Sequence, residues 1–457
     1  MGFTLGEIAA AVWGELLAGT ARARIAGVST DTRLVRRHQI FVAIKGDRFD
    51  GHDFLAQAVT QGATAVLVSR KDVAVPLSIA VIIVEDTVKA LGRLARYHRF
   101  RFRIPVIAVT GSAGKTSTKE MIAAVLGQKY RVLYNQGTEN NHIGVPMTLL
   151  KMSPRHEVAV IEMGTNHPGE IAWLAEITNP TAAVFTNVGP SHLEGLGSPE
   201  GVFEEKISLL KYLSADGCII TNADDPYWNR LLKMGLPQTV LSYGIKAEAD
   251  IHASAVFLDA RGIHVVMASK EEFILKTFSP GAAANALAAV ACGKSQGVAM
   301  PLALKALSRL RPAKGRQCLI RAGGITFVDD TYNANPVSYA NAFKAIEMMK
   351  IRGRAIMAAA DMLELGEHSD EWHRSVGLAA AGSRLDAFFT CGAKAKLMGD
   401  AARSGRTSLD VRHFDGQEAM IEALKVYLQR GDVFLAKGSR GMRMEKVVQE
   451  LVEFVKG

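Results

Sequence analysis

Residues 105–117, PVIAVTGSAGKTS, are the most informative stretch of the sequence, because they indicate a strand, a glycine-rich loop and the start of a helix. The first part, 105–110, is an apolar run typical of a buried strand, and an amphipathic helical pattern follows the segment. Glycines between a strand and a helix let backbone N–H groups converge on phosphate oxygens, and the helix N-terminus adds partial positive charge. Lys115 supplies a mobile charge for the outer phosphates, and the Thr116 hydroxyl is a ligand for Mg²⁺. We therefore predict an ATP-binding loop made of Gly111, Ser112, Ala113, Gly114, Lys115, Thr116 and Ser117.

This loop is a shortened version of the standard pattern, because Val109 stands where a first glycine is usual. The alternative is an ordinary glycine turn carrying an exposed lysine, which the strand–loop–helix context disfavours. A phosphate loop alone does not name a reaction, since motors, kinases, transporters and ligases all use one.

Outward from the loop, the chain divides into three α/β blocks. In the central block, 103–312, the strand-like runs 158–163, 182–186 and 218–221 alternate with helical patterns. Such alternation predicts a doubly wound, mostly parallel sheet with ligands at the carboxyl ends of its strands. A small α/β domain, 1–102, precedes it and a Rossmann-like α/β domain, 313–457, follows it, with Pro312 and Gly315 at a hinge-like junction.

The outer blocks carry their own strand candidates. They are 39–44, 64–68 and 79–84 in the first block, and 325–329, 354–359, 387–390 and 432–436 in the last. Residues 1–17 have Glu7 and Glu15 within an apolar run, which predicts an amphipathic helix and not a secretion signal.

Composition indicates a cytoplasmic protein. The chain has 457 residues, 48% of them hydrophobic and 22% charged, and no apolar run suited to a membrane span. Its 4 cysteines are scattered, which fits a reducing compartment. The net charge of +9 is spread along the chain, so an anionic small substrate explains it at least as well as nucleic acid. We expect a monomer that binds neither nucleic acid nor a membrane.

Three polar residues of the central block are candidates for catalysis. Glu162 closes a strand, where its carboxylate would join Thr116 and phosphate oxygens around Mg²⁺. His192 follows another strand, but taken alone it is more typical of a hydrogen-bonded loop histidine. Lys206 taken alone is a solvated helix lysine or the partner of Glu204 or Glu205.

Longer strings resemble a known family, the Mur ligases of peptidoglycan synthesis. In the central block these are TGSAGKTS, EMG at 162–164, NVGPSHLEGLGS at 187–198, and Lys206. In the last block, DDTYNANPVS at 329–338, DMLELGE at 361–367 and KGSR at 437–440 are similar to the family members that use D-alanyl-D-alanine. GVSTDTR at 27–33 and IFVAIKGDRFDGHDF at 40–54 fit the uridine-nucleotide domain of the family, so the resemblance covers essentially the whole chain.

The resemblance implies a reaction. ATP would phosphorylate the terminal carboxylate of a UDP-N-acetylmuramoyl-tripeptide, and the amine of D-alanyl-D-alanine would displace phosphate to form an amide. Lys115 would neutralise the transferred phosphoryl group. One Mg²⁺ would be held by Thr116 and Glu162, and a second would lie near His192. In the family the lysine that matches Lys206 can be carbamylated, which turns it into a metal ligand.

The resemblance also implies the binding residues. Those for ATP outside the loop are Asn285, Arg316, Asp330 and Asn335. Those for the uridine nucleotide and the peptide are Ser29, Thr30, Asp31, Arg33, Lys45, Asp50, His52, Asn140, Asn141, Lys437 and Arg440. The alternatives are a capping role for Asp330, a plain turn into a helix at 333–336, and simple surface polarity in the first domain.

The chain departs from the family pattern in two polar stretches. Thr138 and Glu139 stand where an asparagine and an apolar residue are usual, and Gly281-Ala282 replace a histidine and an asparagine. Three other functions remain open: addition of the third peptide residue, folate polyglutamylation, and a non-catalytic nucleotide switch or motor. Because the ATP residues are split between two blocks, we expect those blocks to close on binding.

Overall fold

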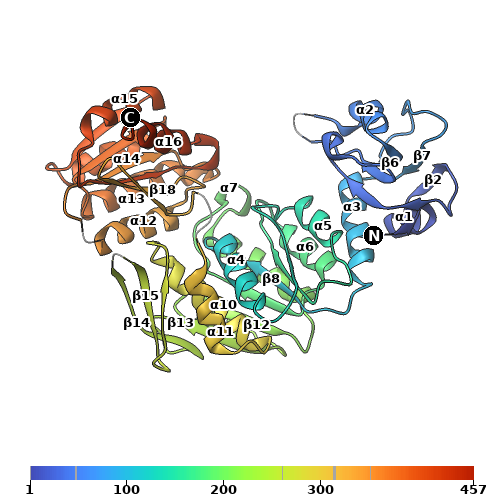
Figure 1. The fold of residues 1–457 in the computed structure, drawn as a ribbon, viewed down its shortest axis with the longest axis horizontal. Helices are drawn as coiled ribbons and strands as arrows, with labels where there is room; N and C mark the ends of the chain where they lie inside the picture. The colour runs from blue at the N-terminus through green and yellow to red at the C-terminus, as the bar shows by residue number, and fades with distance from the viewer. Residues whose placement is uncertain (1, 47–48, 260, 312–314, 350) are drawn as a thin grey trace.

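The computed structural model consists of three α/β units, with the central unit between the other two (Figure 1). It describes residues 2–46, 49–259, 261–311, 315–349 and 351–457. The predicted three-domain α/β fold with parallel sheets is confirmed. The predicted boundary at 312–313, with Pro312, lies outside the described residues. No helix in the described part of the chain has the length and apolar character needed to cross a bilayer.

The N-terminal unit is a five-stranded sheet of order β2 (Glu15–Ala18), β7 (Ala80–Ile83), β6 (Ala63–Val68), β5 (Gln39–Val42) and β4 (Gly27–Ser29). Only the β2–β7 pair is antiparallel. The remaining elements are β1 (Phe3–Thr4), paired with β3 (Arg24–Ile25), and α1 (Leu5–Val12), η1 (Thr32–Leu34), η2 (Gly51–Phe54), α2 (Leu55–Thr60) and α3 (Thr87–Arg99).

The central unit is built on a nine-stranded sheet of order β16 (Glu272–Leu275), β15 (Gly262–Met267), β14 (Ile251–Asp259), β13 (Thr239–Gly244), β12 (Cys218–Asn222), β11 (Ala182–Phe185), β8 (Val106–Thr110), β10 (Val158–Glu162) and β9 (Val132–Tyr134). All neighbouring pairs from β9 across β10, β8, β11, β12 and β13 to β14 are parallel. The pairs β14–β15 and β15–β16 are antiparallel and extend the sheet. Its helices are α4 (Lys115–Leu126), α5 (Gly144–Leu149), α6 (Glu170–Thr178), α7 (Leu193–Leu196), α8 (Pro199–Ile207), η3 (Ser208–Tyr212), α9 (Trp228–Leu232), α10 (Gly281–Ser295) and α11 (Met300–Arg309).

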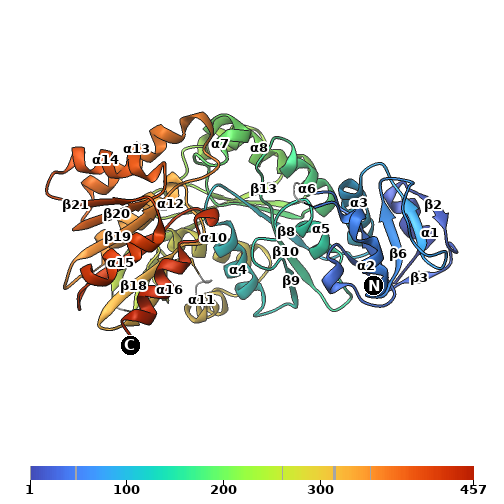
Figure 2. The ribbon, with the colours of Figure 1, turned by 90° about the horizontal axis from the view of Figure 1, so that it is seen from above.

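The C-terminal unit has a six-stranded sheet of order β17 (Cys318–Ala322), β18 (Ile325–Asp330), β22 (Val433–Lys437), β19 (Ala355–Ala360), β20 (Ala387–Cys391) and β21 (Asp410–Phe414). Its helices are α12 (Pro336–Met348), η4 (Gly366–His368), α13 (Ser369–Gly382), α14 (Ala395–Gly405), α15 (Gln417–Tyr427), η5 (Arg440–Met442) and α16 (Glu445–Phe454). Seen from above, this unit lies against the part of the central unit that carries α4 and α10 (Figure 2), and the N-terminal unit lies at the opposite end.

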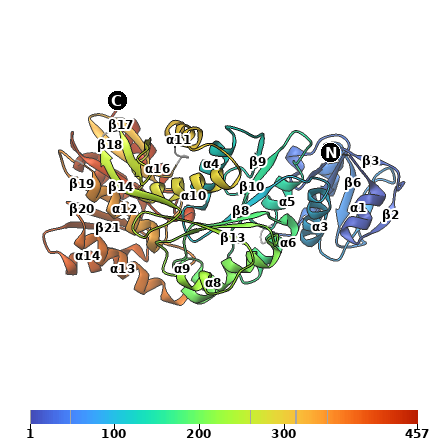
Figure 3. The ribbon, with the colours of Figure 1, turned by 90° about the horizontal axis from the view of Figure 1, so that it is seen from below.

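Helix α3 joins the first two units, and the view from below shows it beside α5 and α6 (Figure 3). A Cβ at Gly92 would lie 2.3 Å from the Trp173 ring, so only glycine allows this approach. The buried Arg99 guanidinium donates to backbone carbonyls at the end of α6, including Thr178 O at 3.0 Å. These contacts give the two units one continuous apolar core.

The predicted helix over residues 1–17 is wrong in its second half. Helix α1 starts with a capping box between Thr4 and Glu7 but ends at Val12. Trp13 is left-handed, with φ 59°, and a Cβ on Gly14 would lie 2.7 Å from Ile83 O. The chain therefore turns, and residues 15–18 pair with β7 because their burial alternates as in a strand.

Candidate active site

A cavity of about 620 Å³ lies between the central and C-terminal units, at the carboxyl ends of β8, β10 and β11. This is where a doubly wound sheet places its ligands. The predicted residues that line it are Ser112, Ala113, Gly114, Lys115, Thr116, Ser117, Asn140, Asn141, Glu162, His192, Asn285, Arg316, Asp330, Asn335, Lys437 and Arg440.

The loop between β8 and α4 has the geometry of a phosphate cradle. Gly111 has φ +149° and a Cβ there would lie 1.9 Å from Thr186 Oγ1, so the loop closes only with glycine at this position. The first backbone hydrogen bond of helix α4 is donated by Thr118 N to Gly114 O, at 2.8 Å. The N–H groups of the preceding helical turn, 115–117, thus have no partner within the helix and are available to an anion.

Asn187 fixes the other side of the loop. Its backbone carbonyl accepts from Ser112 N at 3.0 Å, and its Oδ1 accepts from Ala113 N at 2.9 Å. Asn187 lies two residues after the end of β11 and begins the string NVGPSHLEGLGS. Its role was not predicted, because the contact depends on the pairing of β11 with β8.

The Lys115 side chain is folded back on the loop. Its Nζ donates to Gly111 O at 2.8 Å. Burial lowers the pKa of Lys115, the nearby Arg316 charge lowers it further, and Glu162 opposes both. A triphosphate would supply the anionic partner that this lysine lacks.

Glu162 is the acidic centre of the cavity. Its buried carboxylate accepts at Oε1 from Thr116 Oγ1 (3.0 Å) and from Asn140 Nδ2 (2.8 Å). Its Oε2 is buried without a hydrogen-bond partner among the described residues, 3.9 Å from Lys119 Nζ. An unsatisfied carboxylate oxygen beside a threonine hydroxyl fits a Mg²⁺ site completed by phosphate oxygens. No group of three or more His, Cys, Asp or Glu that could hold a metal occurs in the described ranges.

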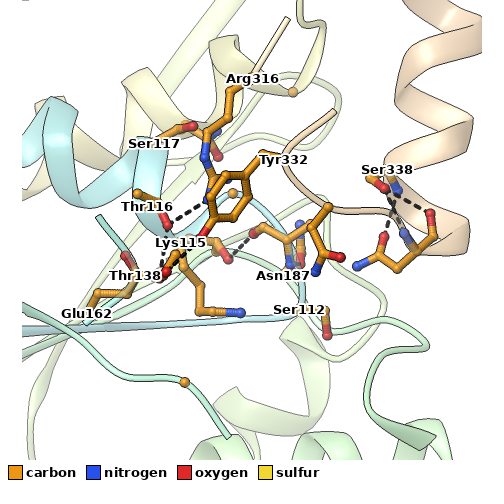
Figure 4. Close-up of a pocket in the computed structure, with 18 of the residues that line it drawn as sticks. Ser112, Lys115, Thr116, Ser117, Thr138, Glu162, Asn187, Arg316, Tyr332 and Ser338 are labelled. Atoms are coloured by element: carbon orange, nitrogen blue, oxygen red, sulfur yellow. Dashed lines mark hydrogen bonds between the residues drawn. The ribbon is translucent and has the colours of Figure 1, made fainter. Parts of the chain in front are cut away.

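Two side chains of the C-terminal unit reach across the cavity (Figure 4). Arg316 Nη2 donates to Thr116 Oγ1 at 3.0 Å, and Tyr332 Oη donates to Thr138 Oγ1 at 2.6 Å. The Arg316 guanidinium lies 4.2 Å from the centroid of the Tyr332 ring. Tyr332 belongs to the quoted DDTYNANP string, although that string alone did not predict this partner.

Asp330 and Lys437 form a buried ion pair at 2.9 Å on the neighbouring strands β18 and β22. Burial raises the pKa of Asp330, and the Lys437 charge partly offsets this rise. Lys437 was predicted to bind substrate, but its Nζ is already held by Asp330 and by Asn333 O at 3.0 Å. Asn335 caps α12 by accepting from Ser338 N at 2.8 Å, as the alternative interpretation of 333–336 expected.

His192 and Lys206 lie in different surroundings. His192 has a left-handed backbone (φ 54°), and its Nδ1 lies 3.1 Å from Glu364 Oε2 of the C-terminal unit. Lys206 is 1% exposed, so the interpretation as a solvated lysine is wrong. Pairing with Glu204 or Glu205 is wrong too: Glu204 pairs with Arg230, and Glu205 accepts from Gly169 N and Ile171 N at the start of α6.

Burial and the Lys115 charge lower the pKa of Lys206 well below its usual value, despite Glu205. Neither Lys206 nor Gly111 is part of the cavity lining. Because its surroundings disfavour the charged ammonium form, the buried Lys206 amine is chemically suited to modification.

The predicted uridine-nucleotide residues lie in the N-terminal unit and outside the lining of the cavity. Several of them pair with one another. Arg33 forms an ion pair with Asp31, and Asp50 Oδ1 lies 2.6 Å from His52 Nδ1. The buried His52 also accepts at Nε2 from Ser69 N, at 3.0 Å. Ser29 Oγ donates to Asp31 O at 2.9 Å, and the backbones of Lys45 and Asp50 form an isolated antiparallel β-bridge.

Gly114 provides a first prediction. Its φ is +81° and a Cβ there would lie 2.6 Å from Asn285 Oδ1. Gly114→Ala should weaken binding of a Mg²⁺-bound ATP analogue about tenfold, because the left-handed conformation alone costs about 1–2 kcal/mol. Isothermal titration calorimetry measures this. The control is Gly382→Ala, where nothing lies within 4 Å of an added Cβ; equal affinities in the two variants would contradict the prediction.

Comparison with known proteins places this geometry in a family. The profile described as Mur ligase family, catalytic domain matches residues 24–99, Mur ligase middle domain matches 109–293, and Mur ligase, glutamate ligase domain matches 315–440. The UDP-N-acetylmuramoyl-tripeptide–D-alanyl-D-alanine ligase of Bacillus subtilis is 38% identical over 94% of this chain and 93% of its own length. The chain belongs to the Mur ligase family.

Solved structures of the family agree with the fold. The crystal structure of MurF from Acinetobacter baumannii covers 99% of both chains, with a TM-score of 0.90 and 31% identity. MurF ligase from Thermotoga maritima in complex with ADP covers 94% of this chain and 98% of its own, with a TM-score of 0.84 and 28% identity.

Proposed function

We propose that the protein joins D-alanyl-D-alanine to the terminal carboxylate of UDP-N-acetylmuramoyl-tripeptide, with ATP converted to ADP and phosphate. The observation that carries the proposal is the single cavity that holds the phosphate loop, Glu162 and residues of the DDTYNANP string. The support from relatives is their shared activity and near-complete overlap with this chain.

In the first step a carboxylate oxygen attacks the γ-phosphorus of ATP, a P–O bond to ADP breaks, and an acyl phosphate forms. The Lys115 ammonium and the free amides at 115–117 stabilise the charge that develops on the transferred group. Thr116 and Glu162 would hold Mg²⁺, which would supply positive charge to offset the negative charge of the phosphates and the carboxylate.

In the second step the amine nitrogen of the dipeptide attacks the acyl carbon. The C–O bond to phosphate breaks, the amine loses a proton, and an amide remains. The protein's task in both steps is to position the reactants and neutralise their charge, because phosphate is already a good leaving group. We also propose a second Mg²⁺ near His192, a cytoplasmic location and a monomeric state; the low number and scattered positions of the 4 cysteines in the sequence support the location.

A phosphate-release assay with each component left out in turn tests the function. We expect phosphate only when ATP, Mg²⁺, the UDP-tripeptide and D-alanyl-D-alanine are all present. Release with a single amino acid or a folate as substrate would favour another ligase of the family. Release without any acceptor would favour a nucleotide switch.

Lys206 provides a second prediction. We propose that the Lys206 amine, in its deprotonated form, adds to CO₂, forming a C–N bond and releasing a proton, so that a carbamate faces the metal region. Activity in CO₂-depleted buffer should fall about tenfold to a hundredfold and return with bicarbonate, and ¹³C-bicarbonate should give a carbamate NMR signal.

The control compares two lysines of the same region. Lys206→Met should lose both the bicarbonate dependence and the carbamate signal, whereas Lys211→Met, at an exposed position, should keep them. Full activity of Lys206→Met without any response to bicarbonate would refute carbamylation.

A further inference from the structure

Tyr332 makes one contact across the cavity and packs against Arg316, which makes another. Its hydroxyl donates to Thr138 Oγ1 at 2.6 Å, although the two residues are 194 positions apart. Its ring faces the guanidinium of Arg316 at 4.2 Å, and the same guanidinium donates to Thr116 of the phosphate loop at 3.0 Å. One side chain thus connects the loop after β9 with the nucleotide side of the cavity (Figure 4).

The backbone holds Tyr332 close to Arg316. Tyr332 N donates to Gly315 O at 3.0 Å, and a Cβ on Gly315, which has φ +75°, would lie 3.2 Å from Tyr332. A second cation lies near the ring, since the Arg440 guanidinium is 5.6 Å from the Tyr332 ring centroid. A ring held in this way restricts where the Arg316 side chain can lie.

Thr138, the acceptor of the tyrosine hydroxyl, belongs to the loop of residues 135–141, which is held by side-chain hydrogen bonds. The fully buried Lys119 donates from Nζ to Asn135 O at 2.7 Å and to Gly137 O at 3.2 Å. Asn135 Nδ2 donates to Glu139 O at 2.9 Å and to Glu162 O at 3.0 Å. Because the residues on both sides of Thr138 are hydrogen-bonded in this way, a movement of Thr138 would also move them.

The loop is also hydrogen-bonded to Glu162, because Asn140 Nδ2 donates to Glu162 Oε1. Thr116 Oγ1 donates to the same oxygen. The contacts form a closed circuit: Thr116, Glu162, Asn140, the loop, Thr138, Tyr332, Arg316 and back to Thr116. Asn140, Asn141 and His142 line the cavity. A ligand that favours this set of contacts from one side would also favour it for a ligand on the other side, and such a dependence is a coupling free energy.

We propose that Tyr332 and Thr138 are positioning residues that make binding of ATP and of the UDP-muropeptide mutually favourable. Tyr332 places Arg316 over the phosphate loop, and its hydroxyl bond to Thr138 joins this arrangement to the loop of residues 135–141. Thr138 is one of the residues at which the chain departs from the family pattern, and its hydroxyl supplies the acceptor. The inference rests on the proposed function, since the second ligand is the UDP-tripeptide.

The test measures the dissociation constant of a non-hydrolysable ATP analogue with Mg²⁺ by calorimetry, with and without saturating UDP-tripeptide. In the wild-type protein the tripeptide should tighten analogue binding. Tyr332→Phe and Thr138→Val should each reduce this tightening about threefold to tenfold, the worth of one hydrogen bond. The double variant should lose no more than either single variant, because both remove the same bond.

Two further variants separate positioning from general damage. Tyr130→Phe also removes one hydroxyl bond, to Gln296 O at 2.8 Å outside the cavity, and should keep the wild-type tightening. Tyr332→Leu removes the ring and should weaken analogue binding even without tripeptide, because Arg316 loses its support.

The outcomes distinguish this inference from the function on which it rests. If the wild-type protein ligates the substrates but shows no tightening, or if Tyr332→Phe and Thr138→Val keep it, the coupling is refuted and the function stands. Additive losses in the double variant also refute it. If the wild-type protein neither ligates nor binds the tripeptide, the proposed function itself fails.

Discussion

Replacing Lys115 by methionine is expected to lower kcat for amide formation about 10²- to 10³-fold, the loss typical of removing one charge-stabilising group from a transition state. Lys115 is the cation of the phosphate loop, and its Nζ has only the Gly111 carbonyl as hydrogen-bond partner among the described residues. Methionine keeps the length and apolar stem of the side chain, so the loss is one of charge. The coupled phosphate assay with all four components measures it.

The matched control is Lys129→Met. Lys129 Nζ also donates to a single backbone carbonyl, Gly297 O at 3.0 Å, but outside the cavity. We expect this variant to keep wild-type kcat and both variants to keep the wild-type circular dichroism spectrum. An undiminished kcat in Lys115→Met would remove the phosphate loop from the mechanism.

Glu162→Gln should have an effect of similar size, together with a higher Mg²⁺ concentration for half-maximal rate. The substitution keeps the shape but removes the charge that Mg²⁺ requires. It also places an amide donor either toward Lys119, 3.9 Å from Oε2, or toward the donors Thr116 and Asn140 on Oε1. Either orientation sets donor against donor in a buried site, which weakens the circuit around the loop.

Steady-state rates across a Mg²⁺ titration test this prediction, with Glu157→Gln as the control. Glu157 pairs with Arg131 at the exposed start of β10 and has no contact with the cavity. A variant at Glu162 with an unchanged Mg²⁺ requirement would exclude this carboxylate as a metal ligand.

Much of the nucleotide side of the site could be predicted from the sequence. A glycine-rich loop between a buried strand and a helix is typical of phosphate binding. Glu162 was predicted to lie beside this loop because parallel strands end at one edge of the sheet. The central strands 106–110, 158–162 and 182–185 were also recognisable, because fully buried parallel strands are continuous apolar runs.

The contacts between distant segments could not be predicted. Tyr332 and Thr138 lie 194 positions apart, and nothing local in either string specifies the other. The buried pair of Asp330 with Lys437 likewise depends on β18 lying beside β22, which the order of elements alone does not determine. At residues 15–18 the helical pattern was misleading because pairing with β7 overrides local preference.

In the proposed mechanism the γ-phosphoryl group of ATP is transferred to the carboxylate of the UDP-tripeptide. Labelling both oxygens of that carboxylate with ¹⁸O and analysing the products by mass spectrometry tests this transfer. The account predicts one ¹⁸O in the released phosphate, one in the new amide carbonyl, and none in ADP. Unlabelled phosphate, or ¹⁸O in AMP, would contradict it.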